Sequence, residues 1–546
     1  MAADHSDPYE DKIVDNDMRI EHIRNAGKII DTNGGPVFTG DIEVTEADSR
    51  RIVRQTDIFI LPLLIWVYFL QILDKSLLGF AASYGLKTYA HLQGNQYSIV
   101  GSMNAIAQLA WMPFSSYLLV RITPRRLMPI VVIGWGASLT GMAFSLSFSS
   151  LVATRFLLGL FEAVCIPLFT IITSIWYRRA EQPLRVAAWY STNGFGTIFA
   201  ALLSWAFAHI QHGKLHGYQI TFLACGLATL VTGALIHWRL DNNASEARFL
   251  SPEDRIKATE RLRVNKTGLL ATDVFKWGQV FEAFLELKMW LFFAMALLLN
   301  VGASVINVFG PLILDGLNFD QSTLTLLNMP LGAVQFIVIL ASSYAAQHYK
   351  IKSIFLLIIV IPVIVGMALL YTTPESSTGV RLFAYYFMAF LFGGNPLIVS
   401  WVAANTGGLT KKSVTISAYN AASAAGNIIG PYLFTTAQAP RYIQGLRDCL
   451  GIFVALFCVV IMQMANIMVL NHRKRRQRVR NGKPEYVTDL SMAREFHEVA
   501  EAGHANDVPA SERIGADELS RVREEQEAAV QRDLTDQEND QFVYLL

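Results

Sequence analysis

The chain has 546 residues, of which 53% are hydrophobic and only 16% are charged. Soluble domains carry about 25% charged residues, so this composition is typical of a membrane protein and argues against a soluble enzyme. The net charge of +1 gives no basis for nucleic-acid binding. The four cysteines lie in apolar runs without a common spacing, so we expect core residues and no disulfide or metal.

The first 56 residues are predicted to form a polar region on the cytoplasmic side of a membrane. They begin with the acidic stretch MAADHSDPYEDKIVDND and contain no recognisable signal peptide. We therefore expect the first membrane-spanning helix itself to direct insertion.

Twelve stretches are long and apolar enough to be membrane-spanning helices, which need about 20 residues each. Six form a predicted N-terminal bundle within residues 57–238, and six form a C-terminal bundle within residues 289–471. SSYLLVRITPRR from Ser115 is echoed by SSYAAQHYKIK from Ser342, 227 residues later. This arrangement predicts an all-α membrane protein with two pseudo-symmetric six-helix bundles, the major facilitator fold. The predicted spans are 58–81, 97–120, 128–148, 151–172, 187–210, 218–238, 289–312, 324–345, 354–371, 382–401, 414–435 and 450–470.

The basic residues of the short loops predict the orientation, because such residues prefer the cytoplasmic side. With both termini in the cytoplasm, the inner loops hold ten Lys and Arg residues and the outer loops hold five. The ten are Arg121, Arg125, Arg126, Arg178, Arg179, Arg185, Lys350, Lys352, Lys411 and Lys412. A multi-pass protein with both termini cytoplasmic is therefore expected.

The segment 239–288 is predicted to be a cytoplasmic connector between the bundles. Ser251 and Asp254 have the spacing of a helix cap around Pro252. Further on, apolar residues from Val274 to Leu285 recur at helical spacing, which indicates an amphipathic helix. It either lies on the inner leaflet or packs against the bundle.

In the C-terminal region, 472–546, a basic run is interpreted as a topology anchor or lipid contact. The part after Pro484 is expected to be mobile.

Four charged residues lie within the predicted spans: Asp74, Lys75, Arg155 and Glu162. Each costs roughly 2.5–3.5 kcal/mol at the centre of a membrane helix, so each needs compensation. In a structural interpretation, Asp74 pairs with Arg155 and Lys75 with Glu162. In a functional one, Lys75 binds an anionic substrate while Asp74 or Glu162 takes up and releases protons. We favour function for these three and leave Arg155 between the two interpretations.

The second bundle has no charged residue at the equivalent positions, so its contribution to a site must be neutral. Asn300, Asn307, Asn395 and Asn405 are the candidates for substrate contact. The stretch FGGNPLIVSW also places two glycines and Pro396 in the tenth span, a combination that loosens a helix where a cavity or gate needs it.

Several stretches resemble the anion:cation symporter family of the major facilitator superfamily, most closely its fungal allantoate permease branch. They include LPLLIWVYFLQILDKSLLGFAASYGL, RFLLGLFEAVCIPLF, WYRRAEQPLR and GNIIGPYLF. The resemblance implies proton handling by Asp74 and Glu162, substrate-carboxylate contact by Lys75 and an organising role for Arg155.

Two features of this sequence depart from the pattern of the family. Many relatives carry arginine where this chain has Lys75, and SYLLVRITPRR lacks the aspartate of the signature GxxxDRxGRR. We therefore expect the gating ion pair of that loop to be absent or supplied by other residues.

From this resemblance we expect proton-coupled uptake of a small organic acid, such as allantoate, nicotinate or pantothenate, across a fungal plasma membrane. The proton gradient would be the driving force, without a cofactor, and a monomer in contact with membrane lipids would suffice. Efflux of a secondary metabolite and a non-transporting nutrient receptor are the alternatives. An enzyme is not expected, because the histidine cluster His209, His212 and His216 has no acidic or cysteine partner nearby.

Overall fold

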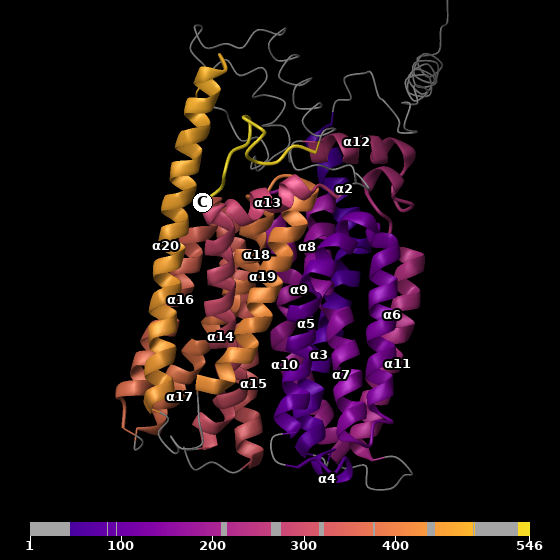
Figure 1. The fold of residues 1–546 in the computed structure, drawn as a ribbon, viewed down its shortest axis with the longest axis vertical. Helices are drawn as coiled ribbons and strands as arrows, with labels where there is room; N and C mark the ends of the chain where they lie inside the picture. The colour runs from indigo at the N-terminus through magenta and orange to yellow at the C-terminus, as the bar shows by residue number, and fades with distance from the viewer. Residues whose placement is uncertain are drawn as a thin grey trace, which may run out of the picture. The chain divides into compact units, whose positions relative to one another are not determined.

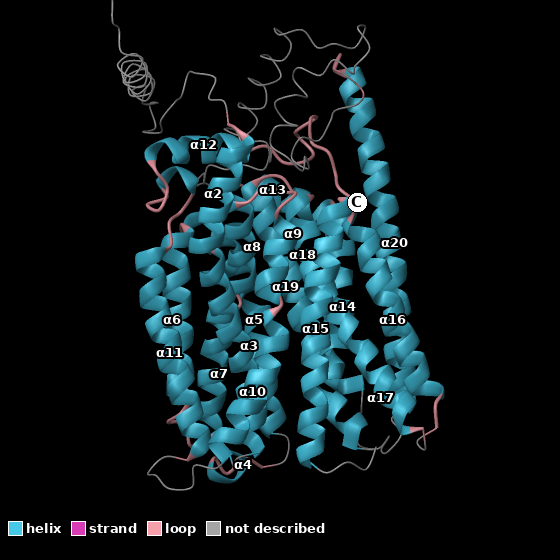
Figure 2. Ribbon diagram, turned by 180° about the vertical axis from the view of Figure 1, so that it is seen from behind, coloured by secondary structure: helices cyan, strands magenta, loops and turns pink. Residues whose placement is uncertain are grey.

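The computed structural model describes residues 44–83, 86–93, 96–208, 216–263, 275–315, 321–374, 377–433, 443–483, 485 and 533–546. Within these residues the backbone forms helices and short loops and no strand (Figure 2). The helices form two bundles that lie side by side, as the indigo-to-magenta and orange parts of Figure 1 show. The connector helices and the C-terminus lie at one end of the bundles, which we call the connector end; helix α4 lies at the opposite end.

The helices of the described residues match the twelve predicted spans, and the predicted fold is confirmed. In the first half they are α2 (Glu46–Phe59), α3 (Leu61–Ser83), α4 (Leu86–Tyr89), α5 (Gln96–Arg121), α6 (Pro124–Met142), α7 (Phe148–Glu162), α8 (Cys165–Trp176), α9 (Gln182–Tyr190), α10 (Thr192–Ala208) and α11 (Gly217–Arg239). In the second half they are α14 (Leu287–Asp315), α15 (Gln321–Tyr349), α16 (Lys352–Thr372), α17 (Thr378–Phe387), α18 (Gly394–Ala404), α19 (Leu409–Ile429) and α20 (Ile443–Arg480). Eight helical segments of the described chain are long and apolar enough to cross a membrane.

Three of the predicted spans are interrupted helices. The fourth consists of α7 and α8, the fifth of α9 and α10, and the tenth of α17 and α18 joined by a 3-10 turn, η2 (Met388–Gly393). The third interruption ends at Gly393, just before Gly394 and Pro396 in the first turn of α18. In the fourth span, Pro167 has no N–H to donate to the carbonyl four residues earlier, that of Ala163. This carbonyl accepts instead from Asn420 Nδ2 of the other bundle, at 2.9 Å.

The two bundles meet along several pairs of helices, among them α9 with α15 and α18. Helix α5 packs against α19, and α10 packs against α15. In the second contact, Gly194 lies so close to the Gly332 backbone that a Cβ atom there would have no space. These glycines therefore set how closely α10 and α15 approach each other.

The connector contains two helices, α12 (Pro252–Arg263) and α13 (Trp277–Leu285). The predicted cap of α12 is present, since the Asp254 N–H donates to Ser251 Oγ at 3.1 Å. Helix α12 is held to α2 by ion pairs of Arg51 with Asp254, at 2.5 Å, and of Lys257 with Asp48, at 3.1 Å. Part of the predicted polar N-terminal region is thus a helix docked on the connector.

Helix α13 presents different faces to the protein and to its surroundings. Gln279 and Ala283 are buried, and the helix packs against α19. Trp277, Phe281 and Leu285 are exposed to 66%, 66% and 86%. The predicted amphipathic helix therefore docks on the bundle through one face and leaves its large apolar side chains pointing outward, as expected at a lipid interface.

A buried ion network holds the loop between α8 and α9 to α12. Glu181 is paired with Arg178, at 3.2 Å, and with Arg261, which is 1% exposed. Burial by itself would raise the pKa of the Glu181 carboxyl, but Arg261 and Arg178 outweigh it and lower this pKa from 4.5 to about 2. Because the pKa is depressed in the folded state, the stabilisation is fully present above pH 4.5 and is lost as the pH falls towards 2.

Replacing Glu181 with Gln is expected to destabilise the protein by about 3–5 kcal/mol, because it leaves buried guanidinium groups without their counter-charge. Thermal unfolding of the detergent-solubilised protein measures the effect. Glu253→Gln is the control, since the exposed Glu253–Lys257 pair contributes less than about 1 kcal/mol. Equal unfolding temperatures for the two variants would contradict the prediction.

The end of the chain departs from expectation. Residues 533–546 pack against the connector end of the second bundle, and residues such as Asp536, Phe542 and Tyr544 are buried. The prediction of a mobile tail is therefore wrong for this segment. Its polar composition was misleading because its polar atoms bind other parts of the protein instead of water.

Candidate functional site

Asp74 is fully buried on α3 inside the first bundle. One of its carboxylate oxygens, Oδ2, accepts a hydrogen bond from the Trp135 indole of α6 at 2.9 Å. The other, Oδ1, is buried without a hydrogen-bond partner among the described residues. A buried carboxylate oxygen without a partner is poorly solvated, which costs free energy.

Glu162 ends α7 and is 1% exposed. Its Oε2 accepts from Asn104 Nδ2 at 2.7 Å and from Gln108 Nε2 at 3.0 Å, both on α5. Its Oε1, like Asp74 Oδ1, has no hydrogen-bond partner within the part of the chain described. Glu162 thus repeats the arrangement of Asp74, with one oxygen fixed by a neighbouring helix and one without a hydrogen-bond partner among the described residues.

Sequence reasoning missed the three residues that hold these carboxylates. Asn104 and Gln108 are four residues apart, so they share a face of α5, and such an amide pair in an apolar span was a visible signal. Trp135 gave a weaker signal in the sequence, since a tryptophan inside a membrane span is more often a packing residue. Only the fold brings its indole to Asp74.

The two basic residues, Arg155 and Lys75, differ in how far they are buried. Arg155 is 3% exposed and its Nε has no hydrogen-bond partner in the described structure, while Lys75 is exposed. Arg155 and Glu162 act electrostatically on Asp74, and Lys75 does so more weakly. The four charged residues therefore form one electrostatic group.

The predicted bracing ion pairs are not formed. Among the described residues, no ion pair within 4.0 Å joins Asp74 to Arg155 or Lys75 to Glu162. Arg155 instead remains a buried cation without a bound carboxylate. In a low-dielectric interior this is costly, and an anionic ligand would relieve the cost.

In the second bundle, two of the predicted asparagines lie together. Asn300 Nδ2 of α14 donates to Asn395 Oδ1 of α18 at 3.3 Å. The same oxygen accepts from the Tyr419 hydroxyl of α19 at 2.5 Å. Tyr419 also interacts with Tyr190 of α9, in the first bundle. We call these four residues the central polar chain; it links the bundles through neutral groups.

The other two asparagines lie elsewhere or are not described. The side chain of Asn307 lies outside the described residues, although its backbone belongs to α14. Asn405 follows α18 ten residues after Asn395, which is about 15 Å along a helix. It is fully buried at the connector end, where its side chain bonds the Leu545 backbone through Nδ2, at 3.0 Å, and Oδ1, at 2.6 Å. The structure therefore does not bring Asn405 to the central polar chain.

The side-chain hydrogen bonds between the bundles lie between the middle of the helices and the connector end, as far as the structure describes them. Besides Asn420 with Ala163, Ser413 Oγ donates to the Ser116 carbonyl at 3.0 Å, and Ser115 and Ser417 are joined at 3.4 Å. In this conformation the bundles are closed against each other at the connector end.

An all-helical membrane fold of two six-helix bundles, with buried charges and polar groups at their boundary, is the architecture of a secondary transporter. Residues 64–431 match the family model of the Major Facilitator Superfamily, and the chain belongs to this superfamily.

Curated relatives and solved structures agree with this assignment. The chain is 32% identical over 431 residues to the thiamine pathway transporter THI73 of Saccharomyces cerevisiae, covering 77% of this chain and 80% of that protein. It is 26% identical to the allantoate permease of the same yeast, covering 83% and 86%. A structure of the proton:xylose symporter XylE has the same fold, with a TM-score of 0.62 at 12% identity, covering 76% of this chain and 95% of that one. The protein is thus a multi-pass secondary transporter similar to fungal members of the superfamily.

Proposed function

We propose that the protein is a proton-coupled symporter that takes up a small organic acid across the plasma membrane, with the connector end and both termini in the cytoplasm. The observation that carries this proposal is a buried group with two half-satisfied carboxylates, Asp74 and Glu162, beside the unpaired buried cation Arg155. The similarity to allantoate permease supports a carboxylate as the substrate.

Charge balance connects substrate and proton. Asp74 and Glu162 carry two negative charges and Lys75 and Arg155 two positive ones, so the group is neutral when it is empty and fully ionised. A bound monocarboxylate adds one negative charge, and one proton on Asp74 or Glu162 restores neutrality. Because unbalanced charge in a low-dielectric interior costs several kcal/mol, binding of the anion favours uptake of one proton. We therefore infer a ratio of one proton to one monocarboxylate.

The residues divide into three roles in this proposal. Lys75 and Arg155 attract and bind the substrate carboxylate. Asp74 and Glu162 hold the proton, each on its unpartnered oxygen. Asn300 and Asn395 supply neutral hydrogen bonds from the second bundle, and Asn307 stays a candidate beside them. Asn405 is left out, because its amide holds the chain terminus. One chain supplies both bundles and needs no cofactor, so a monomer driven by the proton gradient is sufficient.

Uptake of labelled allantoate, nicotinate and pantothenate by transporter-deficient yeast expressing the protein tests this proposal. At least one acid is expected to accumulate above its external concentration, faster at acidic external pH, and to stop accumulating when a protonophore is added. Cells carrying the empty vector are the control.

Three outcomes would count against the proposal. Accumulation that persists without a proton gradient excludes proton coupling. Faster loss of preloaded substrate from expressing cells indicates an efflux transporter. Binding of an acid without any movement across the membrane indicates a receptor.

A further inference from the structure

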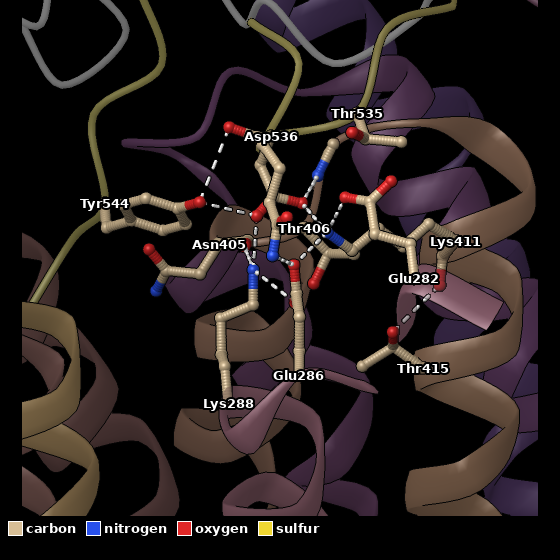
Figure 3. A network of polar contacts seen from close by, with 12 residues as sticks. Glu282, Glu286, Lys288, Asn405, Thr406, Lys411, Thr415, Thr535, Asp536 and Tyr544 are labelled. Carbon is tan, nitrogen blue, oxygen red and sulfur yellow. Dashed lines mark hydrogen bonds and ion pairs between the residues drawn. The ribbon is translucent and has the colours of Figure 1, made fainter. Parts of the chain in front are cut away.

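The last fourteen residues, 533–546, which we call the C-terminal peptide, occupy the connector end of the second bundle. Asp536 is fully buried at the centre of this contact (Figure 3). It is paired with Lys288 Nζ at 2.5 Å and with Lys411 Nζ at 2.8 Å, and it accepts from the Gly407 N–H at 3.1 Å. The Tyr544 hydroxyl of the same peptide donates to it at 2.7 Å. The Asp536 carboxylate is therefore bound by four groups.

The peptide is acidic, and the surface that receives it presents several lysines, of which Lys288 and Lys411 are also paired with Glu286. Lys276 faces Asp533 at 3.4 Å, and Lys474 Nζ donates to the backbone carbonyls of Gln537, at 2.6 Å, and Asn539, at 2.9 Å. Burial by itself would raise the pKa of the Asp536 carboxyl, but Lys288 and Lys411 hold it below its ordinary value. The carboxylate is thus ionised at cellular pH, and its ion pairs are in place.

The end of the peptide extends this contact by backbone hydrogen bonds. The Leu545 carbonyl accepts from the Trp401 indole at 2.7 Å, in addition to its bond with Asn405. The Leu546 carbonyl accepts from the Lys352 N–H at the start of α16, at 2.8 Å. The last residues of the peptide are thus held by specific bonds to α16 and α18.

The peptide also reaches the first bundle through one residue. Arg179, in the loop after α8, donates to the Val543 carbonyl at 3.0 Å, and its guanidinium lies 4.9 Å from the centre of the Phe542 ring. The same arginine donates to the Ala404 carbonyl at the end of α18. Arg179 is 1% exposed, so these contacts are shielded from water and are correspondingly strong.

We propose that the connector end carries a binding site for the chain's own acidic C-terminal peptide, and that the docked peptide holds the two bundles closed there. The proposal deepens the proposed transport function and rests on it, because release of substrate at the connector end requires the bundles to part. In parting, Arg179 must leave Ala404, and it must also leave the peptide as long as the peptide stays on the second bundle. The docked peptide therefore adds bonds that must break before the connector end opens, and any factor that displaces the peptide favours opening.

The C-terminal peptide also places an acidic side chain near the contact between the two bundles. At this end of the protein the C-terminal peptide brings in an acid from a distant part of the chain, Asp536. It lies against Lys411, two residues before Ser413, which bonds α5. The acid thus stabilises α19 close to where α19 meets the first bundle.

Labelling of a cysteine placed between the bundles tests the proposal without any substrate. Ser417 is fully buried against Ser115, in the contact between the bundles, so Ser417→Cys reports the opening of the bundles. The purified protein in detergent is treated with a maleimide, and modification of residue 417 is quantified by peptide mass spectrometry. Deleting residues 533–546 is expected to accelerate labelling several-fold, and a synthetic peptide of that sequence should slow it again.

Single substitutions in the full-length chain sharpen the test and remain informative where the shortened chain fails to fold. Asp536→Asn is expected to weaken docking of the peptide by about tenfold or more, since it removes a buried, hydrogen-bonded charge, and so to accelerate labelling. Glu538→Gln is the matched control, because Glu538 is exposed and forms its hydrogen bonds with Thr535, within the peptide. Unchanged labelling in Asp536→Asn, or equal acceleration in both variants, overturns the proposal. Absence of transport would overturn the proposed function while leaving this result intact.

Discussion

Replacing Glu162 with Gln is expected to abolish concentrative uptake while leaving exchange of substrate across the membrane intact. Glutamine has nearly the shape of glutamic acid and keeps hydrogen bonds to Asn104 and Gln108, the two residues that hold Glu162. It cannot release a proton, so the site behaves as though it were permanently protonated. Substrate can then bind and cross in both directions, but its movement is no longer coupled to the proton gradient.

Proteoliposomes separate these two activities. Uptake driven by an imposed pH gradient should fall to background in Glu162→Gln, whereas counterflow of labelled substrate against unlabelled internal substrate should continue. Glu253→Gln is the control, because Glu253 lies on the exposed surface of α12. Gradient-driven accumulation that survives in Glu162→Gln would assign the proton to Asp74 instead. Loss of counterflow as well would show that Glu162 is needed for substrate binding or for the conformational change.

Replacing Lys75 with Met is expected to weaken substrate binding by about 10- to 100-fold, the worth of a charge-assisted hydrogen bond to a carboxylate. Methionine keeps the length of the side chain and removes its charge. The side chain is exposed on α3 and its ammonium forms no ion pair with a described residue, so the change should cost little stability. A defect in Lys75→Met can therefore be attributed to binding.

Binding of a labelled carboxylate to the purified protein measures this effect, with thermal unfolding as a check on stability. Lys75→Arg is the matched variant, because it restores the charge and adds a planar group that can bind a carboxylate through two hydrogen bonds. Binding by Lys75→Arg at least as tight as that of the unsubstituted protein is expected. If Lys75→Met binds normally, Arg155 alone carries the anion and the role proposed for Lys75 is wrong.

The electrostatic group at the centre of the first bundle was partly predictable. Its four members can be recognised in the sequence, because charged residues are rare in apolar spans. They are Asp74, Lys75, Arg155 and Glu162. Which of them pair is not readable, since residues far apart in the chain face one another only after the helices pack. Pairing by opposite charge was the plausible structural interpretation, yet Asp74 is held by a tryptophan and Glu162 by two amides.

The partners of the neutral asparagines in the second bundle were likewise not predictable from the sequence. Four asparagines were equally plausible candidates by position along the chain. The structure joins Asn300 to Asn395 and assigns Asn405 to a different task, holding the Leu545 backbone. The difference arises because Asn395 and Asn405 lie at opposite ends of α18 and therefore contact different parts of the protein.

The sequence by itself determined the membrane class, the twelve spans and their division into two bundles, because the thickness of a bilayer imposes a length of apolar residues that can be counted along the chain. It also determined where a helix would be capped, at Ser251. Only the tertiary structure decided the partners of the buried charges and the place of the C-terminal peptide. Those contacts join residues hundreds of positions apart, and a polar stretch such as 533–546 has the same composition whether water or a basic protein surface satisfies it.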